Sequence, residues 1–294
     1  MSSKTLLLVN PHSGTGKSLE AAAYLKNKLN NKGFDLEQVM SESVGFFANF
    51  LKGIDLTDYK NIIVVGGDGT MHDVVNGLAE RANVPPILLF PCGSGNAFNH
   101  DIGCLSWDKA LANLERGQTQ KIDLFRLDFP AKSSVYAFNV VGWGLVSTIN
   151  HKAEKLRWLG TARYTLSAVV QILKNPTSKG TVTIDGEIFE GDFCFVLACN
   201  TQHTGKAMKM APLADLSDGL MDILVVKRQP FYKLLQLFPQ IFSGSHISSP
   251  LLTYLKAKSF SVSADSQVLV VDGETQCNAP FSVIILPQQL TMIV

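Results

Sequence analysis

Short apolar runs alternate with amphipathic stretches along the first part of the chain. Most of these runs are continuous rather than alternating, which is typical of strands buried on both faces of a parallel sheet. Strands are predicted at residues 5–10, 61–65 and 87–90, with a more alternating one at 34–40, and helices at 18–30, 44–51 and 71–79. Strands that alternate with helices and are joined by glycine-containing turns predict a parallel α/β domain.

The pattern changes near Lys121, after which the apolar runs are short and separated by turn signals. Asp185-Gly186 and Asp272-Gly273 are dipeptides that favour tight hairpin turns. Strands are predicted at residues 124–129, 135–140, 181–184, 193–199, 221–226, 259–262, 268–271 and 282–286, and helices at 155–174 and 231–242. This succession of short strands predicts an antiparallel β-sandwich.

The two patterns predict two domains, and the 294 residues are enough for two cores. Residues 1–122 form the expected α/β domain, and residues 123–294 form the expected β-sandwich domain. The last predicted strand either stays in the second domain or returns to the first, and the sequence leaves both options open. The fold class is therefore α/β plus all-β, and we expect the active site in the cleft between the two domains.

Composition narrows the function classes only in part. Charged residues make up 17% of the chain, against about 25% in a typical soluble domain. This suits a protein that touches bilayers, although a large core gives the same figures. The net charge of +1 provides no basic field for nucleic acid, and no run approaches the roughly 18 apolar residues of a membrane span. Five cysteines without a CxxC pair indicate reduced, mostly buried thiols in a cytoplasmic protein.

Three glycine-rich turns follow predicted strands in the first domain. The first, NPHSGTGKS at residues 10–18, opens a helix, where free N–H groups can hold phosphate. It is not a P-loop, because Pro11 stands where that motif requires glycine. A plain strand-to-helix turn with Ser18 as the helix N-cap is an equally good interpretation.

The second turn, GGDGT at residues 66–70, places three glycines around Asp68. Glycines let the backbone approach a ligand closely, and the end of a parallel strand is where α/β folds carry their sites. This favours a functional role for Asp68. His72, one turn further on, is expected on the helix surface. The third turn, PCGSGN at residues 91–96, would complete one continuous groove of N–H donors.

Two acidic groups and a pair of arginines lie later in the chain. Asp272-Gly273-Glu274 in isolation predicts a hairpin turn. Asp215, Asp218 and Asp222 suit a hard cation, and equally a solvated acidic turn. Arg157 and Arg163 lie on adjoining faces of a predicted helix, where arginines are usually solvated.

Taken in order, these motifs resemble the diacylglycerol kinase catalytic family. The match runs from NPHSGTGK through GGDGTMHDVVNGL and PCGSGNAF to VDGE, and so covers essentially the whole chain. GGDGT by itself also occurs in NAD kinases and resembles the glycine loop of phosphofructokinases. The segments PCGSGNA and RWLGTARY are closer to the sphingosine kinase and ceramide kinase branch.

The resemblance implies an NAD kinase/phosphofructokinase-like first domain, a lipid-substrate second domain, ATP as phosphoryl donor and magnesium as cofactor. It implies a general base at Asp68, an acidic residue at Glu274 that acts with Asp272, and a structural magnesium site at Asp215, Asp218 and Asp222. The implied nucleotide site comprises Asn10, Lys17, Ser41, Gly66, Gly67, Gly69, Thr70, Gly93, Ser94, Gly95, Asn96, Arg157, Arg163 and Gly273.

The expected reaction is transfer of the γ-phosphate of ATP to the primary hydroxyl of a membrane lipid, namely diacylglycerol, ceramide or a sphingoid base. Sphingosine kinases carry acidic residues where this chain has Thr148 and Asn150. A cationic amine would lose its charged partner there, at a cost of about 2 kcal/mol or more, which favours an uncharged head group.

Two other functions stay open at this point. One is an NAD kinase-like phosphotransferase acting on a soluble substrate, and the other is an inactive lipid-binding protein. We expect a cytoplasmic protein that contacts the membrane surface transiently and does not bind nucleic acid, and a homodimer is left open.

Overall fold

The computed structural model describes residues 4–93, 95–130, 132–154, 162–205, 208–264 and 268–294. The chain divides into two compact units. Unit 1 comprises Met1–Leu124 and Gln288–Val294, and unit 2 comprises Phe125–Pro287. The chain passes from one unit to the other within strand β5 (Thr119–Phe129) and returns within strand β15 (Phe281–Ile293).

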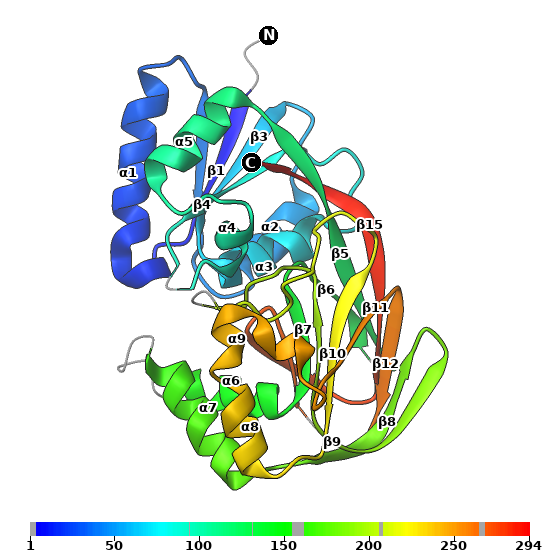
Figure 1. The fold of residues 1–294 in the computed structure, drawn as a ribbon. Helices are drawn as coiled ribbons and strands as arrows, with labels where there is room; N and C mark the ends of the chain where they lie inside the picture. Colours follow the sequence, from blue (N-terminus) through cyan, green and yellow to red (C-terminus); the bar gives the residue numbers. More distant parts are fainter. Residues whose placement is uncertain (1–3, 94, 131, 155–161, 206–207, 265–267) are drawn as a thin grey trace. The chain divides into compact units, whose positions relative to one another are not determined.

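Unit 1 is built on a parallel sheet (Figure 1). Its strands are β1 (Lys4–Val9), β2 (Leu36–Met40), β3 (Tyr59–Gly66) and β4 (Ile87–Pro91), in the order β4-β3-β1-β2. The end of β15 joins β4 in parallel through Met292 and Ile87. The helices are α1 (Lys17–Asn30), α2 (Phe46–Gly53), α3 (Asp68–Leu78), α4 (Ala97–Asp101) and α5 (Trp107–Arg116).

Both faces of this sheet are covered, which explains why its strands are apolar throughout. Leu6, Leu7 and Leu8 are all fully buried although neighbouring side chains point to opposite faces. Leu7 belongs to a core cluster with α1 and α5, which includes Leu25 and Leu114. The predicted α/β domain is confirmed.

Unit 2 is dominated by antiparallel strands. They are β6 (Lys132–Ala137), β7 (Val140–Gly144), β8 (Ser178–Ile184), β9 (Glu187–Cys199), β10 (Met221–Lys227), β11 (Thr253–Ala257), β12 (Ser259–Ser263), β13 (Val268–Val271) and β14 (Glu274–Asn278). The long strand β9 pairs antiparallel with β7, β8 and β10, and β12 pairs antiparallel with β8 and β15. This agrees with the predicted fold class.

Within the described residues of unit 2, four α-helices accompany these strands. They are α6 (Leu145–Glu154), α7 (Ala162–Lys174), α8 (Phe231–Leu237) and α9 (Gln240–Ser243). The predicted helix at 231–242 is divided in two, because Pro239 cannot donate the next helical hydrogen bond. Of the predicted helix at 155–174, residues 155–161 lie outside the described part of the chain.

The prediction of one strand at 135–140 was wrong. β6 ends at Ala137 and β7 begins at Val140, because the backbone N–H groups of Phe138, Asn139 and Val140 donate to the Asp272 carboxylate instead of continuing one ladder. Helices α4, α5 and α6 and strands β11 and β14 were not predicted.

The two Asp-Gly turns were predicted correctly. Asp185 and Gly186 connect β8 to β9 with φ of 44° and 89°, and Asp272 and Gly273 connect β13 to β14 with φ of 50° and 89°. Positive φ at both central positions is the geometry of a type I′ hairpin.

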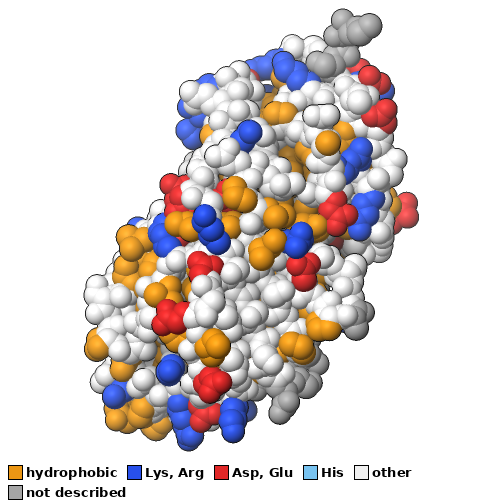
Figure 2. All heavy atoms as spheres, turned by 90° about the vertical axis from the view of Figure 1, so that its right-hand side faces the viewer, with side chains coloured by type: hydrophobic (Ala, Val, Ile, Leu, Met, Phe, Trp, Pro, Cys, Tyr) orange, Lys and Arg blue, Asp and Glu red, His pale blue; other side chains and the backbone are white. Residues whose placement is uncertain are grey.

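Two surface features complete the description. On the face drawn in Figure 2, basic and acidic side chains are interspersed. Within the described ranges, no helix combines the length and the hydropathy that crossing a bilayer requires. Cys92, Cys104, Cys194 and Cys199 are buried and form no disulfide among the described residues, which agrees with the prediction of mostly buried thiols.

Candidate active site

Three glycine-rich loops of unit 1 meet at the carboxyl ends of β1, β3 and β4. They approach so closely that side chains are excluded between them. A Cβ atom added to Gly14 would lie 1.9 Å from the carbonyl oxygen of Cys92, and one added to Gly67 would lie 2.7 Å from the Cα atom of Gly93. The three motifs that the sequence separates by many residues therefore form one group in space.

Side chains as well as backbone connect the first loop to the second. The Nδ2 group of Asn10 donates to Oγ1 of Thr70 at 2.9 Å, and the hydroxyl groups of Ser13 and Thr70 lie 3.3 Å apart. The backbone N–H of Asn10 also donates to the carbonyl oxygen of Val65 at 3.2 Å. Asn10 and Thr70, both predicted at the nucleotide site, are thus in direct contact.

The interpretation of Ser18 as the N-cap of α1 was wrong. The residue at the cap position is Gly16, whose φ of 94° lets the chain turn from a short 3₁₀ segment, Ser13–Gly16, into the helix. Ser18 lies inside the helix, fully buried, and its hydroxyl donates to the carbonyl oxygen of Ser13 at 3.3 Å. The hydroxyl thus stabilises the loop without capping the helix.

Asp68 connects the second loop to the third. It is the first residue of α3, and its carboxylate accepts the backbone N–H groups of Ala97 at 2.9 Å and of Phe98 at 3.3 Å. Asn96, just before them, accepts the backbone N–H of Gly93 at 2.8 Å through Oδ1. The carboxylate of Asp68 is half-buried and is held by backbone donors at the meeting point of the loops.

The other residues predicted at the nucleotide site differ in exposure, and some lie outside the described part of the chain. Lys17 is exposed at the start of α1, and Ser41 is buried, with its backbone N–H donating to Val9. Gly66, Gly69 and Gly95 belong to the second and third loops. Ser94 and Arg157 lie outside the described residues, and Arg163 is described only as a backbone position of α7.

His72 does not lie on the helix surface, as the sequence suggested. It is only 7% exposed, and its Nε2 atom lies 3.4 Å from Nδ2 of Asn76. Met71, Val74 and Val75 on α3 are buried as well, because α3 packs between its sheet and α2. Periodicity alone does not reveal that a helix is covered on two sides.

Asp73 is a residue whose structural role the sequence analysis missed. Its carboxylate accepts the backbone N–H of Gly45 at 2.9 Å, which connects α3 to the segment entering α2. Burial raises the pKa of Asp73, although this hydrogen bond acts against the shift. The sequence signal for this role was an acidic residue five positions after Asp68, on the same predicted helix.

In unit 2, the carboxylate of Asp272 is occupied by hydrogen bonds from backbone N–H groups. The residue is 6% exposed, and its carboxylate accepts the N–H groups of Phe138 at 3.2 Å, Asn139 at 2.9 Å and Val140 at 3.0 Å. Asp272 therefore fastens the β13–β14 turn to the break between β6 and β7. Glu274, two residues later, is exposed at the start of β14.

A buried polar group beside this turn was also missed. Asn200 donates through Nδ2 to the carbonyl oxygen of Phe138 at 2.9 Å, and the hydroxyl of Thr201 donates to Oδ1 of Asn139. Asn139, Asn200 and Thr201 are all at least 97% buried. Three polar residues at the ends of apolar strands were the signal, since such side chains are buried only when they are hydrogen-bonded.

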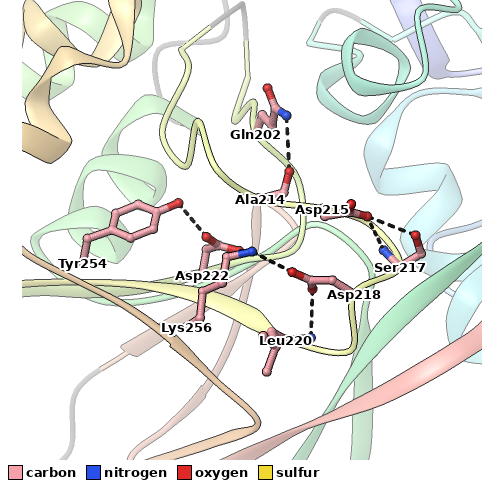
Figure 3. A network of polar contacts seen from close by, with 9 residues as sticks. All are labelled: Gln202, Ala214, Asp215, Ser217, Asp218, Leu220, Asp222, Tyr254 and Lys256. Atoms are coloured by element: carbon pink, nitrogen blue, oxygen red, sulfur yellow. Dashed lines mark hydrogen bonds and ion pairs between the residues drawn. The ribbon is translucent and has the colours of Figure 1, made fainter.

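The three aspartates of the acidic loop have different partners (Figure 3). Asp215 accepts the backbone N–H of Ser217 at 2.9 Å and its hydroxyl at 3.0 Å. Asp218 accepts the ammonium group of Lys256 at 2.6 Å, and the other carboxylate beside Lys256, that of Asp222, lies 3.7 Å from it. A lysine therefore lies between two of the three carboxylates.

Asp222 is the most buried of the three. It is fully buried, and Tyr254 donates to its Oδ1 atom at 2.7 Å. Burial raises the pKa of Asp222 above its ordinary value. Burial alone would lower the pKa of Lys256, but the adjacent carboxylates of Asp218 and Asp222 raise it. Within the described ranges, no three His, Cys, Asp or Glu side chains are arranged to hold a metal ion.

The two residues expected to distinguish acceptor lipids, Thr148 and Asn150, are only partly described. Thr148 lies on α6, half-buried, and its hydroxyl is 3.5 Å from the carbonyl oxygen of Gly144. The side chain of Asn150 is outside the described part of the structure.

Known proteins match both units. The family model described as the diacylglycerol kinase catalytic domain matches residues 4–127, and the one described as the YegS C-terminal NAD kinase beta sandwich-like domain matches residues 139–294. A diacylglycerol kinase of Mycobacterium tuberculosis is 27% identical over 294 residues, covering 99% of this chain and 94% of that protein.

Two further matches extend the comparison. Sphingosine kinase 1 of Arabidopsis thaliana is 25% identical over 322 residues, covering 92% of this chain and 66% of that protein. The crystal structure of a diacylglycerol kinase from Bacillus anthracis strain Sterne has a TM-score of 0.81 at 24% identity, covering 99% of this chain and 96% of the other. That structure has the same fold as this chain.

Proposed function

We propose that this chain, which belongs to the diacylglycerol kinase catalytic family of lipid kinases, transfers the γ-phosphate of ATP to the primary hydroxyl of an uncharged membrane lipid. The predicted family and its branch are confirmed, and with them the prediction of a lipid kinase. The observation that carries the proposal is the Asp68 carboxylate, held by backbone N–H groups where the three glycine loops meet.

The glycine loops suit the phosphate groups of ATP. Phosphoryl transfer depends mainly on positioning and on neutralising charge, and backbone N–H groups do both without a side chain. The contacts of Gly14 and Gly67 bring these backbones together, and Lys17 adds a cation at the end of the first loop. Asn10, Thr70, Gly93 and Asn96 complete this part of the proposed nucleotide site. Arg157 and Arg163 remain predictions from the resemblance.

Asp68 is the proposed general base. The lipid hydroxyl oxygen forms a bond to the γ-phosphorus, the bond from that phosphorus to the β–γ bridging oxygen breaks, and ADP leaves. The hydroxyl proton passes to the carboxylate of Asp68. Its two backbone donors hold the carboxylate in one orientation, which general base catalysis requires.

Magnesium enters the proposal in one place, together with ATP. Bound with ATP, it would neutralise charge on the phosphates, and the exposed carboxylate of Glu274 is suited to join its ligands. Asp272 would support Glu274 through the backbone rather than bind metal, because three N–H groups occupy its carboxylate. The arrangement at Asp215, Asp218 and Asp222 does not fit a metal ion while Lys256 lies between the last two, and these aspartates take no part in the proposed reaction.

The proposed acceptor has a neutral head group. Thr148 offers a hydroxyl and no charge, so it does not compensate the amine of a sphingoid base. Diacylglycerol or ceramide is therefore the proposed acceptor.

The test is a phosphoryl-transfer assay with labelled ATP and magnesium. Mixed micelles present diacylglycerol, ceramide, sphingosine or no added lipid, and a further reaction contains NAD without micelles. We expect label in the organic phase with diacylglycerol or ceramide and little with sphingosine. Label on NAD alone would overturn the proposal and favour an NAD kinase-like enzyme, and no transfer to any acceptor would favour a binding protein.

A further inference from the structure

The ammonium group of Lys256 lies at the acidic loop, between two carboxylates (Figure 3). Its Nζ atom lies 2.6 Å from Oδ2 of Asp218 and 3.7 Å from Oδ2 of Asp222. The other oxygen of Asp218 accepts the backbone N–H of Leu220 at 3.0 Å. The other oxygen of Asp222 accepts the hydroxyl of Tyr254 at 2.7 Å. The ammonium group therefore supplies positive charge where a bound metal ion would supply it.

The register of the sheet fixes the lysine at this place. Strands β10 and β11 pair antiparallel, with Asp222 directly opposite Lys256 and Leu224 opposite Tyr254. Residues directly opposite each other project to the same face of a sheet, as do residues two positions apart on one strand. Lys256 and Tyr254 therefore both reach Asp222. The lysine belongs to the strand framework of unit 2, and not to the loop that carries Asp218.

The burial of Asp222 makes this cation important. The side chain of Asp222 is 1% exposed, against 26% for Asp218 and 35% for Lys256. Within the described ranges, Oδ2 of Asp222 is buried and accepts no hydrogen bond, and the ammonium group of Lys256 is the cation beside it. A buried carboxylate that loses its compensating cation is strongly destabilising.

A divalent metal ion fits poorly at the same two carboxylates. It would stand beside the ammonium group, and two cations at such a short separation repel each other. A hard cation also needs several oxygen ligands. The third aspartate of the loop, Asp215, instead accepts the backbone N–H and the hydroxyl of Ser217.

We infer that Lys256 is a built-in cation, which holds the acidic loop to β11 in place of a bound metal ion. The stability of unit 2 is then independent of divalent cations, and the magnesium requirement of phosphoryl transfer comes from ATP alone. The stability part of this inference goes beyond the proposed function and is tested without ATP or lipid.

The direct test is the melting temperature of the full chain, measured by differential scanning calorimetry. One sample contains EDTA and another contains magnesium chloride, and sodium chloride keeps the ionic strength equal. The same pair of measurements on Asp218→Asn identifies any magnesium response that arises elsewhere in the chain. After that response is subtracted, the two wild-type samples should differ by less than about 1 °C, because a ligand stabilises only a protein that binds it.

Removal of the ammonium group provides a second test. Lys256→Met keeps most of the side-chain stem but leaves Asp222 buried without its cation, so the melting temperature in EDTA should fall by about 4 °C or more. Magnesium should restore part of this loss, since the two carboxylates then lack a cation. The matched control is Lys227→Met, at an exposed lysine of β10, the strand that carries Asp222, and it should melt like the wild type.

Two outcomes would overturn the inference. One is a wild type that gains several degrees with magnesium and loses this gain in Asp218→Asn, which would assign a metal site to the acidic loop. The other is a Lys256→Met variant that is as stable as the wild type in EDTA. If this variant does not fold, the magnesium response of the wild type still decides. Neither result depends on whether the chain phosphorylates a lipid, so the proposed function stands or falls separately.

Discussion

Asp68 in unit 1 and Asp272 in unit 2 are both aspartates in glycine-containing turns, and both accept backbone N–H groups. Asp68 accepts two and is half-buried, whereas Asp272 accepts three and is 6% exposed. The sequence context of the two residues is similar, and their surroundings are not. A carboxylate that still reaches solvent can meet a reactant, while one enclosed by donors stabilises the backbone.

The largest effect is expected when Asp68 is replaced by asparagine. The amide still accepts a hydrogen bond from the α4 backbone but does not take a proton, so lipid kinase activity should fall roughly a hundredfold or more. The initial rate of phosphoryl transfer in mixed micelles measures this.

The matched control for Asp68 is Asp58→Asn, which changes an exposed aspartate of the same unit. It should keep wild-type activity. If Asp68→Asn folds, as circular dichroism would show, and retains normal turnover, then Asp68 is not the general base.

Asp272→Ala should act on stability first. It removes the acceptor of three backbone N–H groups in a buried place, and we expect a loss of about 3 kcal/mol in the free energy of unfolding. Urea denaturation measures this loss.

Glu274→Gln tests whether the two acidic residues of the β13–β14 turn have different roles. Because Glu274 is exposed, the free energy of unfolding should change by less than about 0.5 kcal/mol. The lipid kinase activity of the variant should nevertheless fall if the Glu274 carboxylate takes part in the reaction. Equal destabilisation by the two variants would contradict the division of roles within the turn.

The contact between the loops beside Asp68 is tested by Gly14→Ala. The added Cβ meets the Cys92 carbonyl oxygen, so we expect a cost of about 1–3 kcal/mol beyond that of the positive φ. Gly16→Ala is the control, since Gly16 also has positive φ but has open space around it. Similar unfolding free energies for the two variants would show that the loops do not need this close approach.

The smallest effect concerns a third aspartate, Asp222, which is buried beside a tyrosine and a lysine. Because its folded-state pKa is raised, protonation favours the folded state, and stability is lost as pH rises from the ordinary value of 3.8 through the raised one. Asp222→Asn removes this titration, and its amide oxygen can still accept from Tyr254.

Thermal unfolding at a series of pH values measures the effect at Asp222. The variant should gain stability relative to the wild type as the pH rises above 3.8, and the two should differ by a constant amount below it. A difference that does not vary with pH would show that the folded-state pKa of Asp222 is not raised.

Much of the fold followed from local pattern. The strands of unit 1 are continuous apolar runs because the sheet is covered on both faces, and β3 and β4 lie where the runs predicted them. The turns at Asp185 and Asp272 followed from Asp-Gly chemistry. The short helices α4 and α6 were missed, since α4 has only five residues and α6 follows a glycine turn with weak apolar spacing.

The sequence predicted several residues of the candidate site but not the contacts between them. The three glycines around Asp68 identified that residue as a candidate, and the resemblance to the diacylglycerol kinase family added Asn10 and Thr70. The sequence did not show that Asn10 donates to Thr70, or that Asp68 is held by Ala97, because these contacts join residues 60 and 29 positions apart.

The sequence by itself determined the two architectures and the glycine loops, both of which depend on neighbouring residues along the chain. Only the tertiary structure decided that His72 is buried, that Asp272 serves the backbone and that Lys256 lies between two carboxylates. Those outcomes depend on which surfaces meet when distant segments pack. Periodicity shows that a helix has an apolar side, but the surroundings decide what that side contacts.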